Sequence, residues 1–150
     1  MQDKQLFVPE KISMLEFKML KGQVEAAESF DADSVLKHQV KSTLELGFNI
    51  TDKLVKADFT IAITADSEGL EKSSVTGNFH FVFVYKVDNL DELAIVGKNN
   101  MVDLDGALGN ALSSITYSTS RGILLTRLQG TALQNFILPV INPNNLFNDK

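Results

Sequence analysis

The side chains that could act as acids or bases near neutral pH are the two histidines, His38 and His80. A catalytic histidine works beside a nucleophile or a metal, and neither one lies in a zinc motif of the His-Glu-x-x-His type. Ser118 and Ser120 lie in a stretch rich in serine and threonine, without the Gly-x-Ser-x-Gly turn that exposes a nucleophilic serine. The sequence therefore predicts no catalytic residue, and His80 is expected to be structural or simply exposed.

Metal chemistry has no better support. Asp103 and Asp105 precede Gly106 as in a calcium loop, but the third acidic position and the terminal glutamate are missing. Capping of a helix is the better interpretation of these two aspartates. The chain has no cysteine, which excludes disulfides, thiolate metal sites and cysteine nucleophiles. We expect no metal, no cofactor and no enzymatic activity.

The composition limits the class of protein. A chain of 150 residues suits a single domain, residues 1–150. A net charge of −5 and only two arginines argue against nucleic-acid binding. The first residues lack the charged start and apolar segment of a secretory signal, and no run of about 18 apolar residues could cross a membrane. We expect a cytoplasmic protein that does not insert into membranes.

Three segments alternate apolar and polar side chains, which is typical of strands with one buried face. They lie at residues 40–50, 55–64 and 75–85, and short connections join them. Short connections favour antiparallel neighbours, so these strands predict a meander. An earlier strand is expected at residues 15–26. Between it and the second strand, residues 28–38 form a loop whose three large apolar side chains must pack on something or bind something.

The last third of the chain predicts one long helix. It begins near Asp103 or Asp105 and runs to about Gln129, with Gly130 as its stop. Strands followed by a helix, without βαβ alternation, indicate the α+β class. We therefore predict a four-stranded antiparallel meander sheet packed with one long C-terminal helix.

The predicted helix has almost no charged outer face. From Gly106 to Asn148 the only charged side chains are Arg121 and Arg127, whereas a surface helix usually carries charges on its outer side. A second copy of the helix would cover this side, so we expect a homo-oligomer; an exposed neutral face is the alternative. Small residues are expected to line the outer side: Gly109, Ser113, Ser114, Ser118 and Ser120. The expected interface residues are Leu108, Leu112, Ile115 and Gly122.

The end of the chain has a distinctive order of residues. The run Ile115-Thr116-Tyr117-Ser118-Thr119-Ser120-Arg121-Gly122-Ile123 is followed by Gly130-Thr131, then by Leu138-Pro139-Val140-Ile141-Asn142-Pro143 and Leu146-Phe147. This order resembles the close of SecB export chaperones, and the preceding strands and loop match the same fold from about Leu15 onward. The sequence departs from the family at Thr116, where a proline is usual, and at Gly122, where an acidic residue is usual. The sequence ends at Lys150, so the second helix and the acidic tail of the export chaperones are expected to be missing.

The resemblance implies a bacterial, ATP-independent holdase that binds unfolded or nascent polypeptides on an apolar groove, with protein export as one use. It also implies a homotetramer built as a dimer of dimers, and a translocation motor ATPase as a further partner. A dedicated chaperone for one client such as an antitoxin, and a protein that binds a small ligand in a pocket, are the alternatives. The groove is expected between the loop at 28–38, the sheet and the helix end. Its expected lining is Phe17, Phe30, Leu36, Phe48, Phe79, Phe81, Leu128 and Phe136.

Overall fold

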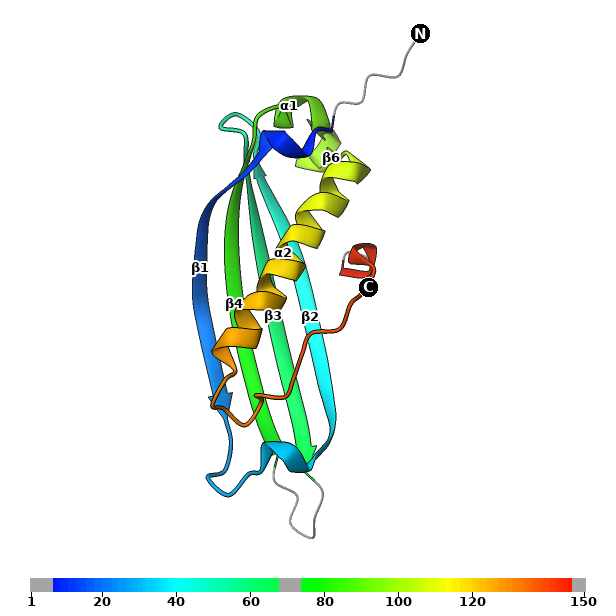
Figure 1. Cartoon of the computed structure of the whole chain (residues 1–150). Coiled ribbons are helices and arrows are strands. Elements are labelled where there is room, and N and C mark those ends of the chain that lie inside the picture. Colours follow the sequence, from blue (N-terminus) through cyan, green and yellow to red (C-terminus); the bar gives the residue numbers. More distant parts are fainter. Residues whose placement is uncertain (1–6, 68–73, 147–150) are drawn as a thin grey trace.

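Four long strands form an antiparallel sheet that carries one long helix on one face. The computed structural model describes residues 7–67 and 74–146 (Figure 1). The strands are longer than their periodic segments alone indicate, and each includes residues beyond the clear alternation. Their bounds are β1 Ile12–Glu25, β2 Val35–Asn49, β3 Leu54–Ser67 and β4 Ser74–Val87.

The strand order is β1-β4-β3-β2, with every neighbouring pair antiparallel. The predicted meander is confirmed for β2, β3 and β4. The first strand does not continue it beside β2, because the connection after Glu25 crosses the end of the sheet and leaves β1 paired with β4 (Figure 1). Two register shifts interrupt the β1–β4 pairing, one between Met14 and Glu16 and one between Met19 and Lys21, and each marks a β-bulge.

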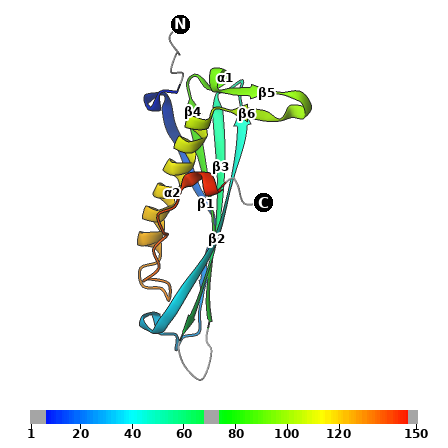
Figure 2. The same ribbon diagram turned by 90° about the vertical axis from the view of Figure 1, so that its right-hand side faces the viewer.

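The two faces of the sheet differ as the alternation predicts. On one face Phe59, Phe81 and Phe83 are completely buried and form the centre of the core. The other face carries polar side chains such as Thr60 and His80, which lie directly opposite each other on β3 and β4. In Figure 2 the helix α2 lies on one side of the sheet only. All of the helical cover is therefore on the apolar face.

The helix α2 spans Gly106–Arg127, and Asp105 caps it by accepting a hydrogen bond of 3.1 Å from the backbone N–H of Leu108. Asp103 instead lies in a short strand. After the helix, Gly130 adopts a left-handed φ of 78°, which glycine tolerates best. The expected cap and stop are thus confirmed in position.

The helix buries residues that the sequence places on its outer side. Ser113, Thr116 and Ser120 are completely buried against the sheet, although Ser113 and Ser120 were expected on the outer side. Leu108 and Leu112 have no exposed surface, so these two residues are corrected from the expected interface between copies to the protomer's own core. The reason is that the leucines pack on the sheet's apolar face, and in the same row Ser113 and Thr116 find hydrogen-bond partners in Gly109 and Tyr85.

A small hairpin precedes α2 and was not predicted. A short helix, α1 (Leu90–Leu93), leads into β5 (Ala94–Val96), which pairs with β6 (Val102–Leu104). Figure 2 shows the hairpin projecting on the side of the sheet opposite α2. The remaining elements are single 3₁₀ turns: η1 Pro9–Lys11, η2 Ala32–Ser34, η3 Lys98–Asn100 and η4 Pro143–Leu146.

Beyond α2 the chain turns back along the apolar face. Leu133 is completely buried and packs over Gly77 of β4, where an added Cβ would come within 2.6 Å of the leucine Cδ1. The chain then runs as residues 137–146, named here the C-terminal strap, past the β2 side of α2 (Figure 1). Its last turn, η4, packs on both α2 and β2. One helix and one strap together cover the apolar face.

Candidate functional site

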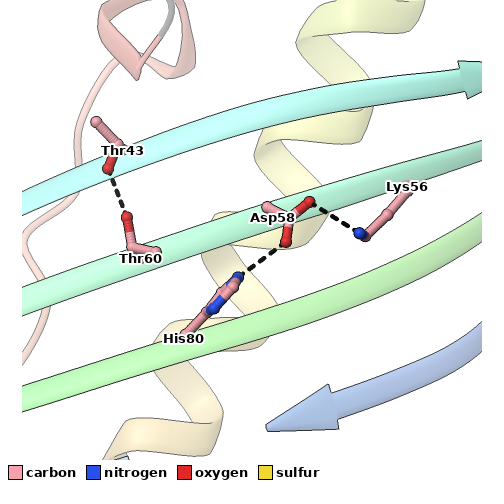
Figure 3. A network of polar contacts seen from close by, with 5 residues as sticks. All are labelled: Thr43, Lys56, Asp58, Thr60 and His80. Carbon is pink, nitrogen blue, oxygen red and sulfur yellow. Dashed lines mark hydrogen bonds and ion pairs between the residues drawn. The ribbon is translucent and has the colours of Figure 1, made fainter. Parts of the chain in front are cut away.

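The polar face holds the arrangement closest to catalytic machinery. His80 Nε2 lies 2.8 Å from Asp58 Oδ1, and Lys56 Nζ lies 3.5 Å from the other oxygen of the same carboxylate (Figure 3). Thr60 stands opposite His80, but its hydroxyl is hydrogen-bonded to Thr43. In the described part of the chain no hydroxyl contacts the imidazole, so a nucleophile–base pair is missing here.

This polar network borders a shallow depression of about 250 Å³ whose lining consists of Thr43, Glu45, Asp58, Thr60 and His80. The side chain of His80 is 31% exposed and that of Asp58 is 27% exposed, as expected for a solvated cross-strand pair. Among residues 7–67 and 74–146, no three His, Asp or Glu side chains are placed to hold a metal ion. The network is best described as pairing that stabilises the sheet surface.

Apolar side chains on this polar face are covered without any further element. Val82 is buried and Val84 partly buried, and their direct neighbours on β1 are Lys18 and Glu16, which form an ion pair of 3.0 Å. Long side chains commonly cover apolar surface with their aliphatic stems. The cover of these two valines is therefore supplied at least partly by the protomer's own β1.

The apolar side presents three hollows beside the helix. The first lies at the lower end of the sheet, between the loop after β1 and the turn after α2, and has a volume of about 410 Å³. Phe30 is a large apolar residue of its wall and is partly buried. This is the place where the sequence predicts a groove bordered by the loop and the helix end. The lining is Ala26, Ala27, Glu28, Phe30, Asp31, Ala32, Gly130, Thr131, Ala132 and Gln134.

The second hollow lies between β1 and α2 and has a volume of about 430 Å³. Phe17 forms its floor from the strand, with its ring centroid 5.0 Å from that of Phe83. Gly122 and Ile123 contribute from the helix, where the missing side chain of the glycine leaves space. The hollow opens beside the sheet edge formed by β1.

The third hollow, of about 270 Å³, lies where the C-terminal strap meets α2. The Tyr117 hydroxyl donates a hydrogen bond of 2.6 Å to the carbonyl oxygen of Pro139, and Arg121 Nε donates one of 3.2 Å to the carbonyl of Leu138. The guanidinium also lies 5.4 Å from the centre of the tyrosine ring. Burial raises the pKa of Tyr117, and the nearby positive charge of Arg121 only partly opposes this. The phenol therefore stays protonated and remains a donor.

A contact between His38 and Phe136 fixes the start of the returning segment. The two rings meet edge to face with centroids 5.4 Å apart. Beside them Asn135 Nδ2 donates hydrogen bonds to Asp33 Oδ1, at 2.9 Å, and to the carbonyl of Ala32, at 3.3 Å. Burial lowers the pKa of His38 from its ordinary value of about 6.5. The loop before β2 and the turn after α2 are thereby joined.

The residues predicted to line a client groove divide into two groups. Phe17, Phe30 and Phe48 are partly buried, and Leu36 is 70% exposed, so these four present surface. The other four lie in the core, and each is at most 5% exposed. Phe79 still contributes to the lining of a hollow of about 750 Å³ that Ile141 and Leu146 also line. The helix and strap cover the other three, which line none of the hollows and are corrected: Phe81, Leu128 and Phe136.

Other exposed apolar residues escaped the sequence reasoning. Four lie on the edge strand β1, and they are 36–59% exposed. At the interface predicted for the helix, Gly122 is exposed and Ile115 partly buried. Tyr117 and Arg121 were noted only as part of a family-like order of residues, and their role in holding the strap was not predicted. The exposed β1 residues are Met14, Leu15, Met19 and Leu20.

Comparison with known proteins bears on the fold. No protein-family model and no curated protein matches the chain in sequence. Among solved structures, the Mycobacterium tuberculosis SecB-like chaperone Rv1957, in complex with a ChAD peptide from the HigA1 antitoxin Rv1956, is similar with a TM-score of 0.61. The match covers 88% of this chain and 91% of that one, at 10% sequence identity. The fold is SecB-like.

A second solved structure, a protein of unknown function from Streptococcus agalactiae, also has 10% identity and covers 86% of this chain and 97% of its own. Its TM-score of 0.31 is too low to add to the argument. The likeness to the SecB-like chaperone thus lies in the three-dimensional arrangement, at 10% sequence identity. In the SecB-like fold of this chain, all three hollows lie on the helix-bearing side of the sheet. No helix within residues 7–67 and 74–146 is long and apolar enough to cross a bilayer.

Proposed function

We propose that this protein is an ATP-independent holdase chaperone that binds unfolded or nascent polypeptides. The observation that carries the proposal is the apolar edge strand β1, which exposes Met14, Leu15, Met19 and Leu20 beside the hollow floored by Phe17. An edge strand offers unpaired main-chain groups, and adjacent apolar hollows take side chains. An extended, unfolded segment meets both requirements.

Two further features support a polypeptide client over a small ligand. The hollows are open and spread along the protein from the lower loop to the middle of the helix, whereas a small-ligand site is usually a single enclosed cavity. Contiguous apolar patches on a protein surface commonly mark a site that binds another macromolecule. Client binding would then come mainly from apolar burial, at about 25 cal/mol per Å².

The first prediction concerns suppression of aggregation. A chemically denatured, aggregation-prone client is diluted into buffer with and without a stoichiometric amount of the protein, and light scattering is followed. We expect the wild type to suppress scattering. The double variant Leu15→Ser and Leu20→Ser removes two exposed apolar groups of β1 and should weaken suppression at least about threefold, because each buried side chain contributes about 1.5–3 kcal/mol.

A matched control changes an exposed apolar residue elsewhere. Met101, at the tip of the β5–β6 hairpin, is 72% exposed. The variant Met101→Ser should leave the suppression of aggregation unchanged. Equal loss in both variants would point to general surface hydrophobicity. Unchanged scattering with the wild-type protein would count against the holdase function itself.

A dedicated chaperone for one client is the second candidate, because the solved structure with TM-score 0.61 is a SecB-like chaperone in complex with an antitoxin peptide. Affinity capture from native lysate separates the two. A general cytoplasmic holdase would retain many nascent chains, together with a translocation motor ATPase if export is its use. A dedicated chaperone would retain one dominant partner.

A further inference from the structure

The C-terminal strap is bound to the rest of the protein in the manner of a peptide ligand. From Ile137 to Ile141 it forms neither helix nor strand. Leu138 is only 2% exposed, while Val140 is 86% exposed, so the segment has an inserted side and a free side. Ile141 and Leu146 add further inserted side chains, which also line a larger hollow of about 750 Å³ together with residues of β2, β3 and β4.

Two hydrogen bonds hold the strap through its main chain. Tyr117 and Arg121 donate to the carbonyls of Pro139 and Leu138, and both donors come from the rigid helix α2. In the described part of the chain, the residues from Ile137 to Ile141 make no backbone–backbone hydrogen bond. Because carbonyls occur at every residue, this pair of donors suits many sequences, including a proline that lacks an N–H group.

We propose that the client-binding surface extends to the β2 side of α2, that the strap occupies this part of it in cis, and that a client displaces the strap. This inference rests on the proposed holdase function. The groove then takes an extended segment with aliphatic residues three positions apart, as Leu138 and Ile141 are. Tyr117 and Arg121 transfer their hydrogen bonds from the strap carbonyls to those of the client. Proline between the two anchors is accepted, since both donors read carbonyl oxygens.

Competition with the strap lowers the observed affinity for the client. A client that must displace a bound segment binds only to the fraction of molecules in which the groove is open. The stability of the strapped state rests largely on Leu138, because truncating a buried leucine removes apolar contact and leaves a cavity. Val140 contributes almost no buried surface. These two positions therefore form a matched pair of variants.

The second prediction follows from this pair. Full-length wild type, Leu138→Ala and Val140→Ala are titrated with a fluorescently labelled denatured client. We expect Leu138→Ala to bind about tenfold more tightly, because a larger fraction of molecules is open, and Val140→Ala to match the wild type. A peptide with the sequence of residues 136–146 should compete with the client for Leu138→Ala, and a scrambled peptide should not.

The outcomes separate the inference from the function on which it rests. If wild type and Val140→Ala bind the client while Leu138→Ala binds equally or more weakly, the strap does not compete, and the inference is overturned although the holdase function stands. If none of the three binds any denatured client, the proposed function itself has failed. Circular dichroism checks that Leu138→Ala is folded; if it is not, Ile141→Ser, at a partly buried strap position, takes its place.

Discussion

At the scale of single residues, two hydroxyl groups on the buried face of α2 differ in their hydrogen bonding. Thr116 shares a hydrogen bond of 2.7 Å with the Tyr85 hydroxyl, deep in the core. Burial raises the pKa of Tyr85, although the bond to Thr116 opposes this, so the phenol stays neutral. Ser120 is equally buried, but its hydroxyl has no hydrogen-bond partner in the described part of the chain. An unpaired buried polar group lowers stability.

The third prediction uses this contrast. Ser120→Ala should raise the free energy of unfolding, or leave it unchanged, because it removes an unsatisfied group at nearly constant volume. Thr116→Val should lower it by about 1–3 kcal/mol, since the Tyr85 hydroxyl then loses its buried partner. Urea denaturation followed by circular dichroism measures both. A destabilised Ser120→Ala would mean that its hydroxyl has a partner after all, such as an ordered water.

At the scale of elements, the sequence predicts those whose side chains repeat with a clear period. The alternation at 40–50 and 55–64 locates β2 and β3, since one face of each strand is buried. Asp105 and Gly130 locate the ends of the helix region through cap chemistry. Alternation cannot reveal the partner of β1, because an apolar face fits beside either edge of the sheet.

Other elements carry no periodic signal. The strands β5 and β6 have only three residues each, too few to alternate recognisably. The strap is a short segment with two prolines, Pro139 and Pro143, and two of its hydrogen bonds come from side chains of α2. The expected outer position of Ser113 and Ser120 was wrong because serine is typical of surfaces, whereas here both share the buried face of α2 with Thr116, which is hydrogen-bonded to Tyr85. Four of the predicted groove residues are core residues for a different reason. The sequence shows that their aromatic and leucine side chains are apolar, but it does not show which element covers them.

The contact of His38 in β2 with Phe136 beyond α2 makes the junction of these elements sensitive to pH, which is the fourth prediction. Burial disfavours the charged imidazole, so the folded-state pKa lies below the unfolded value of about 6.5. The unfolded chain binds the proton first as the pH falls. Stability is therefore complete above about pH 6.5 and declines below it, until the folded-state pKa is passed.

Urea titrations at several pH values between 5 and 8, run on wild type and His38→Gln, measure this effect. The glutamine keeps a polar side chain but does not titrate, so the variant should lose part of the decline on the acidic side. Identical pH dependence in both proteins would assign the decline to other groups, such as the carboxylates.

At the scale of the whole molecule, the outer side of α2 lacks cover within one protomer. Gly122 is exposed and Ile115 partly buried, as a helix-to-helix interface requires, while Leu108 and Leu112 belong to the core. We expect a homotetramer built as a dimer of dimers. The fifth prediction is that light scattering at micromolar concentration gives the mass of four chains, and that Gly122→Glu shifts it toward smaller species.

The choice of Gly122 separates assembly from folding. An added Cβ there meets no atom within 4 Å, so the protomer tolerates the substitution while a bulky charge enters the contact between copies. Gly47 of β2 is also exposed and equally open around its Cα, and Gly47→Glu serves as the control. A monomeric wild type would remove the helix interface from consideration, and equal behaviour of the two variants would place the contact elsewhere.

The two bulges of β1 affect how readily copies of the protein could aggregate through this edge strand. A straight apolar edge strand is a template to which identical chains can add, strand by strand in one repeated register, to form fibrils. The irregularities beside Met14 and Met19 break that repeat and increase the local twist. An unfolded client segment, as proposed above, could adapt its backbone to the bends, whereas a growing fibril requires an even strand spacing. The two bulges thus oppose polymerisation through this edge strand.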